Sequence, residues 1–115
     1  MVNTNKIWNV IYYPPKGENN SPEDILYSYY PVDQNKITRS LTTISNLEMY
    51  HWPPKWVKLI KNIDLYQLTA GDFRAYFGIS GKNIVVCHIC RKRSQEAKDI
   101  DLNRANINFN KYVKE

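Results

Sequence analysis

Positively charged side chains gather in one stretch of the chain, where they could bind a phosphate backbone. Residues 65–98 read LYQLTAGDFRAYFGISGKNIVVCHICRKRSQEAK, a pattern typical of three strands separated by turns and followed by a basic cluster. Arg74 lies inside one expected strand, and Arg91, Lys92 and Arg93 end another. Three or four cations held on a rigid sheet would form a good site for phosphate groups.

Two cysteines flank His88 in the expected last strand. Cys87 and Cys90 have C-x-x-C spacing, which can indicate zinc, redox chemistry or haem attachment. Side chains three apart on a strand point to opposite faces, so we expect the sulfurs to diverge. The sequence has no second Cys/His pair for a zinc tetrahedron, and Arg91 stands where haem attachment requires histidine. We therefore expect no metal and no cofactor, and buried free thiols typical of a reducing cytoplasm.

The other common catalytic patterns do not occur. The sequence contains no phosphate-binding P-loop, no G-x-G-x-x-G and no H-E-x-x-H, and only four glycines in all. A histidine such as His88 on a strand is typical of a packed core residue; the alternative is a general base or a phosphate contact.

Size and charge indicate one folded domain that faces a polyanion. The 115 residues suffice for a single core, and the net charge is +5. Residues 1–50 carry four Lys/Arg and five Asp/Glu, whereas residues 51–115 carry twelve and six. The alternative is an ordinary solvated basic surface. No signal peptide or membrane-spanning apolar run is present, so we expect a cytoplasmic protein without a membrane partner.

Seven elements are expected along the chain. A strand over Ile7–Tyr13 ends at two prolines. A short helix follows, capped by Ser21 and running to about Tyr29, and Pro31 interrupts it. Asp33 can cap a second helix, whose apolar stripe recurs at helical spacing: Ile37, Leu41, Ile44 and Leu47. Three strands and a terminal helix complete the chain: Asp64–Leu68, Phe73–Ile79, Asn83–Cys90 and Asp99–Lys114.

This order predicts an α+β domain with its helices on one face of a small antiparallel sheet, made of the N-terminal strand and the three-strand meander. Alternation in the last strand puts His88, Cys90 and Lys92 on one face, together with Ile84 and Val86, and puts Arg91 and Arg93 on the other. A bulge at the strand end could re-aim one of these cations. Arg74 is costly to bury alone, so we expect it in a partly open groove.

The basic stretch resembles the C-terminal half of the RelE/ParE toxin superfamily, most closely its phage-derived, HigB-like branch. That branch has a YELR…G-x-x-R-x-x-Y/F hairpin, an hhLLHGFxKK strand, a polar TQK-like turn and a terminal helix. The counterparts here, in the same order, are YQLT (66–69), GDFRAYF (71–77), HICRKR (88–93) and SQEAK (94–98). The resemblance spans about Trp56 to Glu115 and implies a RelE-like fold.

The resemblance also implies metal-independent cleavage of messenger RNA on the ribosome. The RNA 2′-hydroxyl would attack the adjacent phosphate and leave a 2′,3′-cyclic phosphate and a 5′-hydroxyl. Carried over, Arg74 would hold the scissile phosphate, and Arg93 would act at the end of the last strand with Lys92 or Arg91. The candidates for proton transfer are His88, Lys98 and Tyr112. The candidate RNA-binding residues are Lys55, Lys58, Arg91 and Lys92.

Two departures from the family pattern leave alternatives open. Leu65 and Gln67 stand where some members have paired lysines, and Thr69 replaces the YELR arginine. A domain that binds RNA or a protein without cutting is therefore one alternative. A non-enzymatic gyrase inhibitor like the ParE branch is another, although that branch lacks the basic residues present here.

The family also implies a protein partner, an antitoxin with a helix-turn-helix DNA-binding part. Because the cations are concentrated after residue 50, we expect an acidic segment of that partner to cover the basic face. The apolar face of the second helix, around Ile37–Leu47, is the competing surface.

Overall fold

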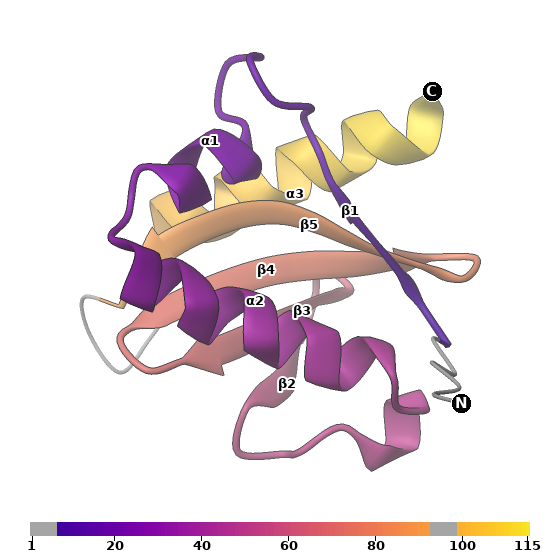
Figure 1. The fold of residues 1–115 in the computed structure, drawn as a ribbon. Coiled ribbons are helices and arrows are strands. Elements are labelled where there is room, and N and C mark those ends of the chain that lie inside the picture. Colours follow the sequence, from indigo (N-terminus) through magenta and orange to yellow (C-terminus); the bar gives the residue numbers. More distant parts are fainter. Residues whose placement is uncertain (1–6, 93–98) are drawn as a thin grey trace.

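The chain folds around one five-stranded sheet (Figure 1). The computed structural model describes residues 7–92 and 99–115. The strand order is β1-β5-β4-β3-β2. The strands are β1 (Asn9–Tyr12), β2 (Val57–Ile60), β3 (Leu65–Ala70), β4 (Phe73–Ser80) and β5 (Asn83–Arg91). With three α-helices around this sheet, the α+β class expected from the sequence is confirmed.

The sheet is mixed rather than antiparallel. Strands β3, β4 and β5 form the expected antiparallel meander, but β1 runs parallel to β5, with Asn9 opposite Asn83. The antiparallel prediction for the N-terminal strand is wrong because apolar alternation defines the faces of a strand and not its direction. Strand β2, which pairs antiparallel with β3, was not expected. Its four residues VKLI form an edge strand too short to show an alternating pattern.

The helices begin at recognisable sequence signals. They are α1 (Pro22–Tyr27), α2 (Pro31–Ser45) and α3 (Asp99–Lys114), with a 3-10 turn η1 (Met49–His51). Ser21 caps α1 as expected, and its side chain accepts a hydrogen bond from the Asp24 N–H at 3.5 Å. Helix α2 starts at Pro31, where an interruption was expected, with Tyr30 and not Asp33 at the cap, because proline suits the first helical position. Among the described helices, none combines the length and apolar character needed to cross a membrane.

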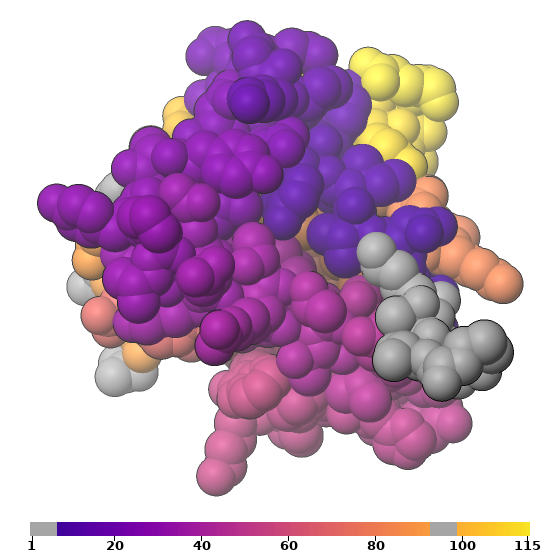
Figure 2. All heavy atoms as spheres, in the orientation of Figure 1, coloured from indigo at the N-terminus to yellow at the C-terminus, as the bar shows by residue number. Residues whose placement is uncertain are grey.

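Helices cover both faces of the sheet, which corrects the expectation of one covered face. Helices α1 and α2 lie on the near side in Figure 1, and α3 lies behind β5. The space-filling view shows the N-terminal half of the chain covering much of the near side (Figure 2). The expected stripe of α2 is confirmed as core, since Ile37, Leu41 and Ile44 are fully buried against the sheet. A second core forms on the other side, where Ala105 and Phe109 of α3 pack.

A β-bulge changes the side-chain pattern in the middle of β5. The pairing with β4 passes from Tyr76 opposite His88 to Phe77 opposite Val86, so Cys87 is one extra residue in β5. Val86 packs in the core under α1 and α2, whereas both Cys87 and His88 face α3. Such a bulge shifts the alternation of everything beyond it by one residue.

The bulge overturns two predictions about faces. Ile89 returns to the core under α1 and α2, so Cys90 faces α3 together with Cys87, and the expected divergence of the two sulfurs is wrong. His88 and Cys90 do share a face, but not with Ile84 and Val86, which lie on the opposite side. Period-two alternation assumes an uninterrupted ladder, and no residue in this strand signals the interruption.

A glycine allows α3 to lie close to the sheet. A Cβ atom at Gly78 of β4 would overlap the ring of Phe109, so this residue has no room for a side chain. The closest packing of α3 is on β5 and β4. Strands β3 and β2 therefore lie near the edge of the sheet surface that α3 covers.

We expect Gly78→Ala to destabilise the fold by about 1–3 kcal/mol, because the added methyl group must displace the Phe109 ring or the helix that carries it. Gly78 does not have a positive φ, so alanine itself suits the backbone. Urea unfolding measures the change. In a Phe109→Ala background the same substitution should cost much less; an equal cost in both backgrounds would contradict this account.

Candidate functional site

A small cavity lined by cations opens beside β2 and β3 on the α3 side of the sheet. Arg74 faces this side because its neighbours Phe73 and Ala75 face the core under α1 and α2. The cavity has a volume of about 220 Å³. Its lining residues are Pro54, Lys55, Trp56, Val57, Lys58, Gln67, Thr69, Arg74 and Lys92. This basic cavity brings together four of the cations that the sequence analysis selected.

The register of the sheet positions the central part of the basic cavity. Lys58 of β2 lies opposite Gln67 of β3, and Thr69 of β3 lies opposite Arg74 of β4. Directly opposed residues of neighbouring strands share a face, so these side chains form two adjacent rows across the sheet. Arg74 is only 3% exposed, so its side chain is more enclosed than the partly open groove that the sequence predicts for it.

Two backbone features bring the remaining cations to the same place. The Lys92 N–H donates to the carbonyl of Asp72 at 2.6 Å, which fixes the end of β5 beside the turn before Arg74. The carbonyl of Pro53 accepts hydrogen bonds from the N–H groups of Trp56 and Val57, both at 3.0 Å. This turn holds Lys55 at the entrance to β2. Lys92 and Lys55 therefore extend from ordered backbone at opposite ends of the cavity lining.

The charge and polarity of the basic cavity favour an anionic ligand. Among the described residues that line it, four are cations and none is acidic. Gln67 is 3% exposed, and its Oε1 has no hydrogen-bond partner in the described part of the chain. Clustered cations in a concave site focus positive potential and attract anions, and guanidinium and ammonium groups match phosphate oxygens. The arrangement can bind a phosphate group and stabilise charge that develops on it.

Arg91 does not join this cavity. Its guanidinium lies over the Phe73 ring, 4.9 Å from the ring centre, and Phe73 belongs to the core under α1 and α2. The expectation that Arg91 and Lys92 face opposite ways therefore agrees with the structure. Two further candidates, Arg93 and Lys98, lie outside the described residues.

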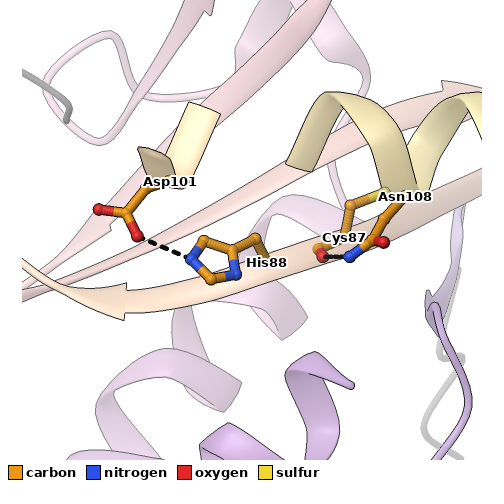
Figure 3. A network of polar contacts seen from close by, with 4 residues as sticks. All are labelled: Cys87, His88, Asp101 and Asn108. Carbon is orange, nitrogen blue, oxygen red and sulfur yellow. Dashed lines mark hydrogen bonds and ion pairs between the residues drawn. The ribbon is translucent and has the colours of Figure 1, made fainter. Parts of the chain in front are cut away.

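His88 is part of a buried contact between β5 and α3. Its Nε2 and Asp101 Oδ1 are 2.9 Å apart, and both residues are buried (Figure 3). In the same view Asn108 donates a hydrogen bond to the Cys87 carbonyl at 2.9 Å. These two bonds fix α3 on the sheet. Of the two interpretations of His88 from the sequence, this environment agrees with a packed core residue. His88 is 3% exposed and does not line the basic cavity.

Tyr76 lies between His88 and the basic cavity. Its ring stacks on the His88 ring at 6.3 Å, and the side chain is fully buried. Burial raises the pKa of Tyr76 to about 12; Cys90 adds to the rise and Arg74 opposes it. Tyr76 is therefore a neutral phenol at physiological pH and cannot serve as a proton acceptor there.

Three donor atoms next to the basic cavity have types that zinc accepts. The ligand atoms of His88, Cys90 and Asp101 lie within 4.8 Å of one another, and all three residues are buried. Imidazole, thiolate and carboxylate are the usual zinc ligands. The His88–Asp101 hydrogen bond already accounts for two of them, and Arg74, opposite Cys90 in the sheet, adds a positive charge that opposes a bound cation.

Tyr112 lies away from the other predicted residues. Its hydroxyl is 3.5 Å from Asn83 Nδ2, and its ring makes an edge contact with Tyr13. Asn83 begins β5, whereas Arg74 and Lys92 lie near the other end of that strand. The structure therefore does not bring Tyr112 to the cations.

Sequence reasoning missed two residues of the cavity wall and one of its rim. Gln67 was noted only as a departure from paired lysines, and Thr69 only as a replaced arginine. Trp56 appears in the sequence analysis only as the start of the span that resembles the toxin superfamily. The register of β2 on β3 identifies these residues as part of the cavity. The sequence does not predict a strand at β2, so it could not supply this register.

We expect Lys92→Ala to weaken binding of a short single-stranded RNA several-fold at low salt, because one phosphate contact is lost. Arg91→Ala is the matched control: it removes the same charge from the adjacent residue but on the other face of the sheet. Fluorescence anisotropy over a salt series measures both, and only Lys92→Ala should reduce the salt slope, by roughly one. Equal losses in the two variants would mean that net charge alone drives binding.

We also expect the Cys87 thiol to be inert in the native protein. Burial raises its pKa to about 12, with a backbone hydrogen bond from Gly78 partly opposing the rise, so the reactive thiolate is scarce at pH 8. A Cys90→Ser variant isolates Cys87, and its reaction with a thiol reagent should become fast only in denaturant. Rapid labelling without denaturant would contradict the buried position.

Comparison with known proteins assigns no family to the chain. No protein-family model matches it, and a search of curated proteins finds no match. The resemblance to the RelE/ParE superfamily therefore stays an expectation drawn from sequence motifs.

Proposed function

We propose that this protein is the toxin of a toxin–antitoxin pair and cleaves messenger RNA on the ribosome, as its resemblance to the RelE and HigB branches implies. The observation that carries the proposal is the basic cavity, where Lys55, Lys58, Arg74 and Lys92 line one concave site on a rigid sheet. Arg74 is the residue that the resemblance assigns to the scissile phosphate. Its partners in the cavity come from three other segments of the chain.

The proposed reaction is a transesterification. The ribose 2′-oxygen forms a bond to the adjacent phosphorus, and the bond from phosphorus to the 5′-oxygen breaks. The products are a 2′,3′-cyclic phosphate and a 5′-hydroxyl; one proton leaves the 2′-oxygen and one reaches the 5′-oxygen. Negative charge grows on the phosphate oxygens in the transition state, and the cavity's guanidinium and ammonium groups would stabilise it.

Arg74 and Lys58 have the clearest roles in this scheme. The fixed guanidinium of Arg74 would bind two phosphate oxygens at once, which a lysine cannot reproduce. As an ammonium group in the cavity wall, Lys58 would donate the proton to the departing 5′-oxygen. Lys98, the lysine of the polar turn, lies outside the described residues and is the remaining candidate from the resemblance for accepting the 2′-proton.

The buried amide of Gln67 favours RNA over DNA as the ligand. Gln67 lines the basic cavity, and its buried Oε1 lacks a hydrogen-bond donor in the described part of the chain. A ribose 2′-hydroxyl can donate such a bond and deoxyribose cannot. A role on gyrase-bound DNA, the ParE-like alternative, would leave this acceptor unused.

A second candidate function is binding to RNA without cleavage. It is favoured by the absence of imidazole and carboxylate groups among the described residues that line the basic cavity. In either case an antitoxin with an acidic segment would be attracted to this face, and its binding would weaken with salt. The two candidates differ in whether products form.

The decisive experiment is translation of a defined messenger RNA in a cell-free extract, with primer extension to map breaks. We expect breaks within ribosome-bound messages, and a 2′-deoxy substitution at the break site should abolish them. Arg74→Lys should slow cleavage on the order of 100-fold, because charge remains but bidentate contact is lost. Arg91→Ala, on the opposite face, is the control and should cleave normally. Intact messages at stoichiometric protein, with RNA still bound, would favour the non-cleaving alternative.

A further inference from the structure

The three tryptophans of this chain have different surroundings. Trp8 and Trp52 contact each other at 5.7 Å between ring centres, and their indole N–H groups donate to the carbonyls of Leu47 and Ile44, both at 2.9 Å. These two rings are structural. Trp56 is 41% exposed, and its indole bonds to no residue in the described part of the chain.

Trp56 lies between two cavities. It lines the basic cavity, and it also lines a larger one of about 480 Å³ on the α2 side of the sheet edge. Thr69 lines both cavities as well. The two cavities therefore share part of their lining, Trp56 and Thr69, at the edge of the sheet. We call this shared lining the junction.

The second cavity is also cationic at its rim. Lys36 and Arg39 of α2 line it, and no acidic residue does so among those described. A strand bound at Arg74 and continuing past Trp56 would thus meet a second pair of cations. Sites for single-stranded nucleic acid combine a cationic groove with aromatic side chains on which bases stack.

The backbone around Trp56 is fixed before any ligand binds. The Trp56 N–H donates to Pro53 at 3.0 Å, and its carbonyl accepts from the Thr69 N–H at 2.7 Å. Pro53 and Pro54 precede it and restrict the chain further. An aromatic ring held in this way loses little conformational entropy on binding.

We propose that Trp56 is the stacking platform for a nucleobase of the bound RNA, next to the phosphate that Arg74 holds, with the following phosphate directed toward Lys36 and Arg39. This inference rests on the proposed function, since it names how the same ligand continues beyond the basic cavity. Stacking on an indole accepts every base, so this contact gives affinity and register along the strand but little sequence preference.

The test measures binding of a five-nucleotide oligoadenylate and of a series in which each base in turn is replaced by an abasic ribose. Abasic oligonucleotides keep every phosphate, so they separate stacking from charge. For the wild-type protein one abasic position should weaken binding by about 5- to 150-fold, the usual range for one stacked base. Trp56→Ala should bind the intact strand that much more weakly and should no longer distinguish it from the abasic strand.

Two variants serve as controls. Trp56→Phe keeps a ring and should retain most of the affinity. Tyr50→Ala removes another exposed aromatic residue, 79% exposed and part of neither cavity, and should bind like the wild type. Thermal unfolding of each variant checks that the fold is retained.

The outcomes separate this inference from the function on which it rests. If Trp56→Ala keeps the wild-type affinity, or still discriminates against the abasic strand, the stacking role is overturned while Lys92→Ala continues to test RNA binding. If a polyglutamate peptide binds the wild-type protein and loses the same affinity in Trp56→Ala, the junction takes acidic protein segments and the inference is also overturned. If the wild-type protein does not bind the oligonucleotide at all, both this inference and the proposed function are overturned.

Discussion

The position of α3 is the constraint on which the rest of the structure depends. The buried contact between His88 and Asp101 and the fit of Phe109 over Gly78 hold the helix against β5 and β4. A buried carboxylate is costly unless it is hydrogen-bonded, so the His88 partner is what makes Asp101 acceptable there. With α3 fixed in this position, the sheet surface at β3 and β2 is free to form a cavity. The packing of α3 on β5 and β4 therefore also determines where the basic cavity lies.

The bulge in β5 makes this docking compatible with a cationic site. If the residues of β5 alternated without the bulge at Cys87, His88 would face the core under α1 and α2, where a buried histidine would meet only apolar groups. With it, His88 faces Asp101, and Arg91 and Lys92 fall on opposite sides. Only Lys92 then reaches the basic cavity beside Arg74. The interrupted alternation at the bulge therefore determines which side chains of β5 face α3 and which cation lines the basic cavity.

Much of this could be read from the sequence, and the failures have physical causes. The turns at Gly71 and Gly81 separate the apolar segments of β3 to β5, and α2 and the terminal helix have apolar residues at helical spacing. The sequence also predicts the four cations that line the basic cavity. The bulge, the parallel direction of β1 and the short β2 are set by tertiary pairing, which no local period encodes. Trp56 and Gln67 could be identified as cavity residues only once β2 was placed on β3.

The composition of the basic cavity also has an energetic consequence. Four cations that line one small concave surface repel one another, and one of them, Arg74, is almost completely buried. Natural proteins keep such unfavourable clusters where function requires them. A bound polyanion would relieve the repulsion and stabilise the folded state in proportion to its binding. The same electrostatics that would attract the proposed RNA substrate would also attract an acidic protein segment, so the antitoxin that we propose would need only to cover the cations to compete for this surface.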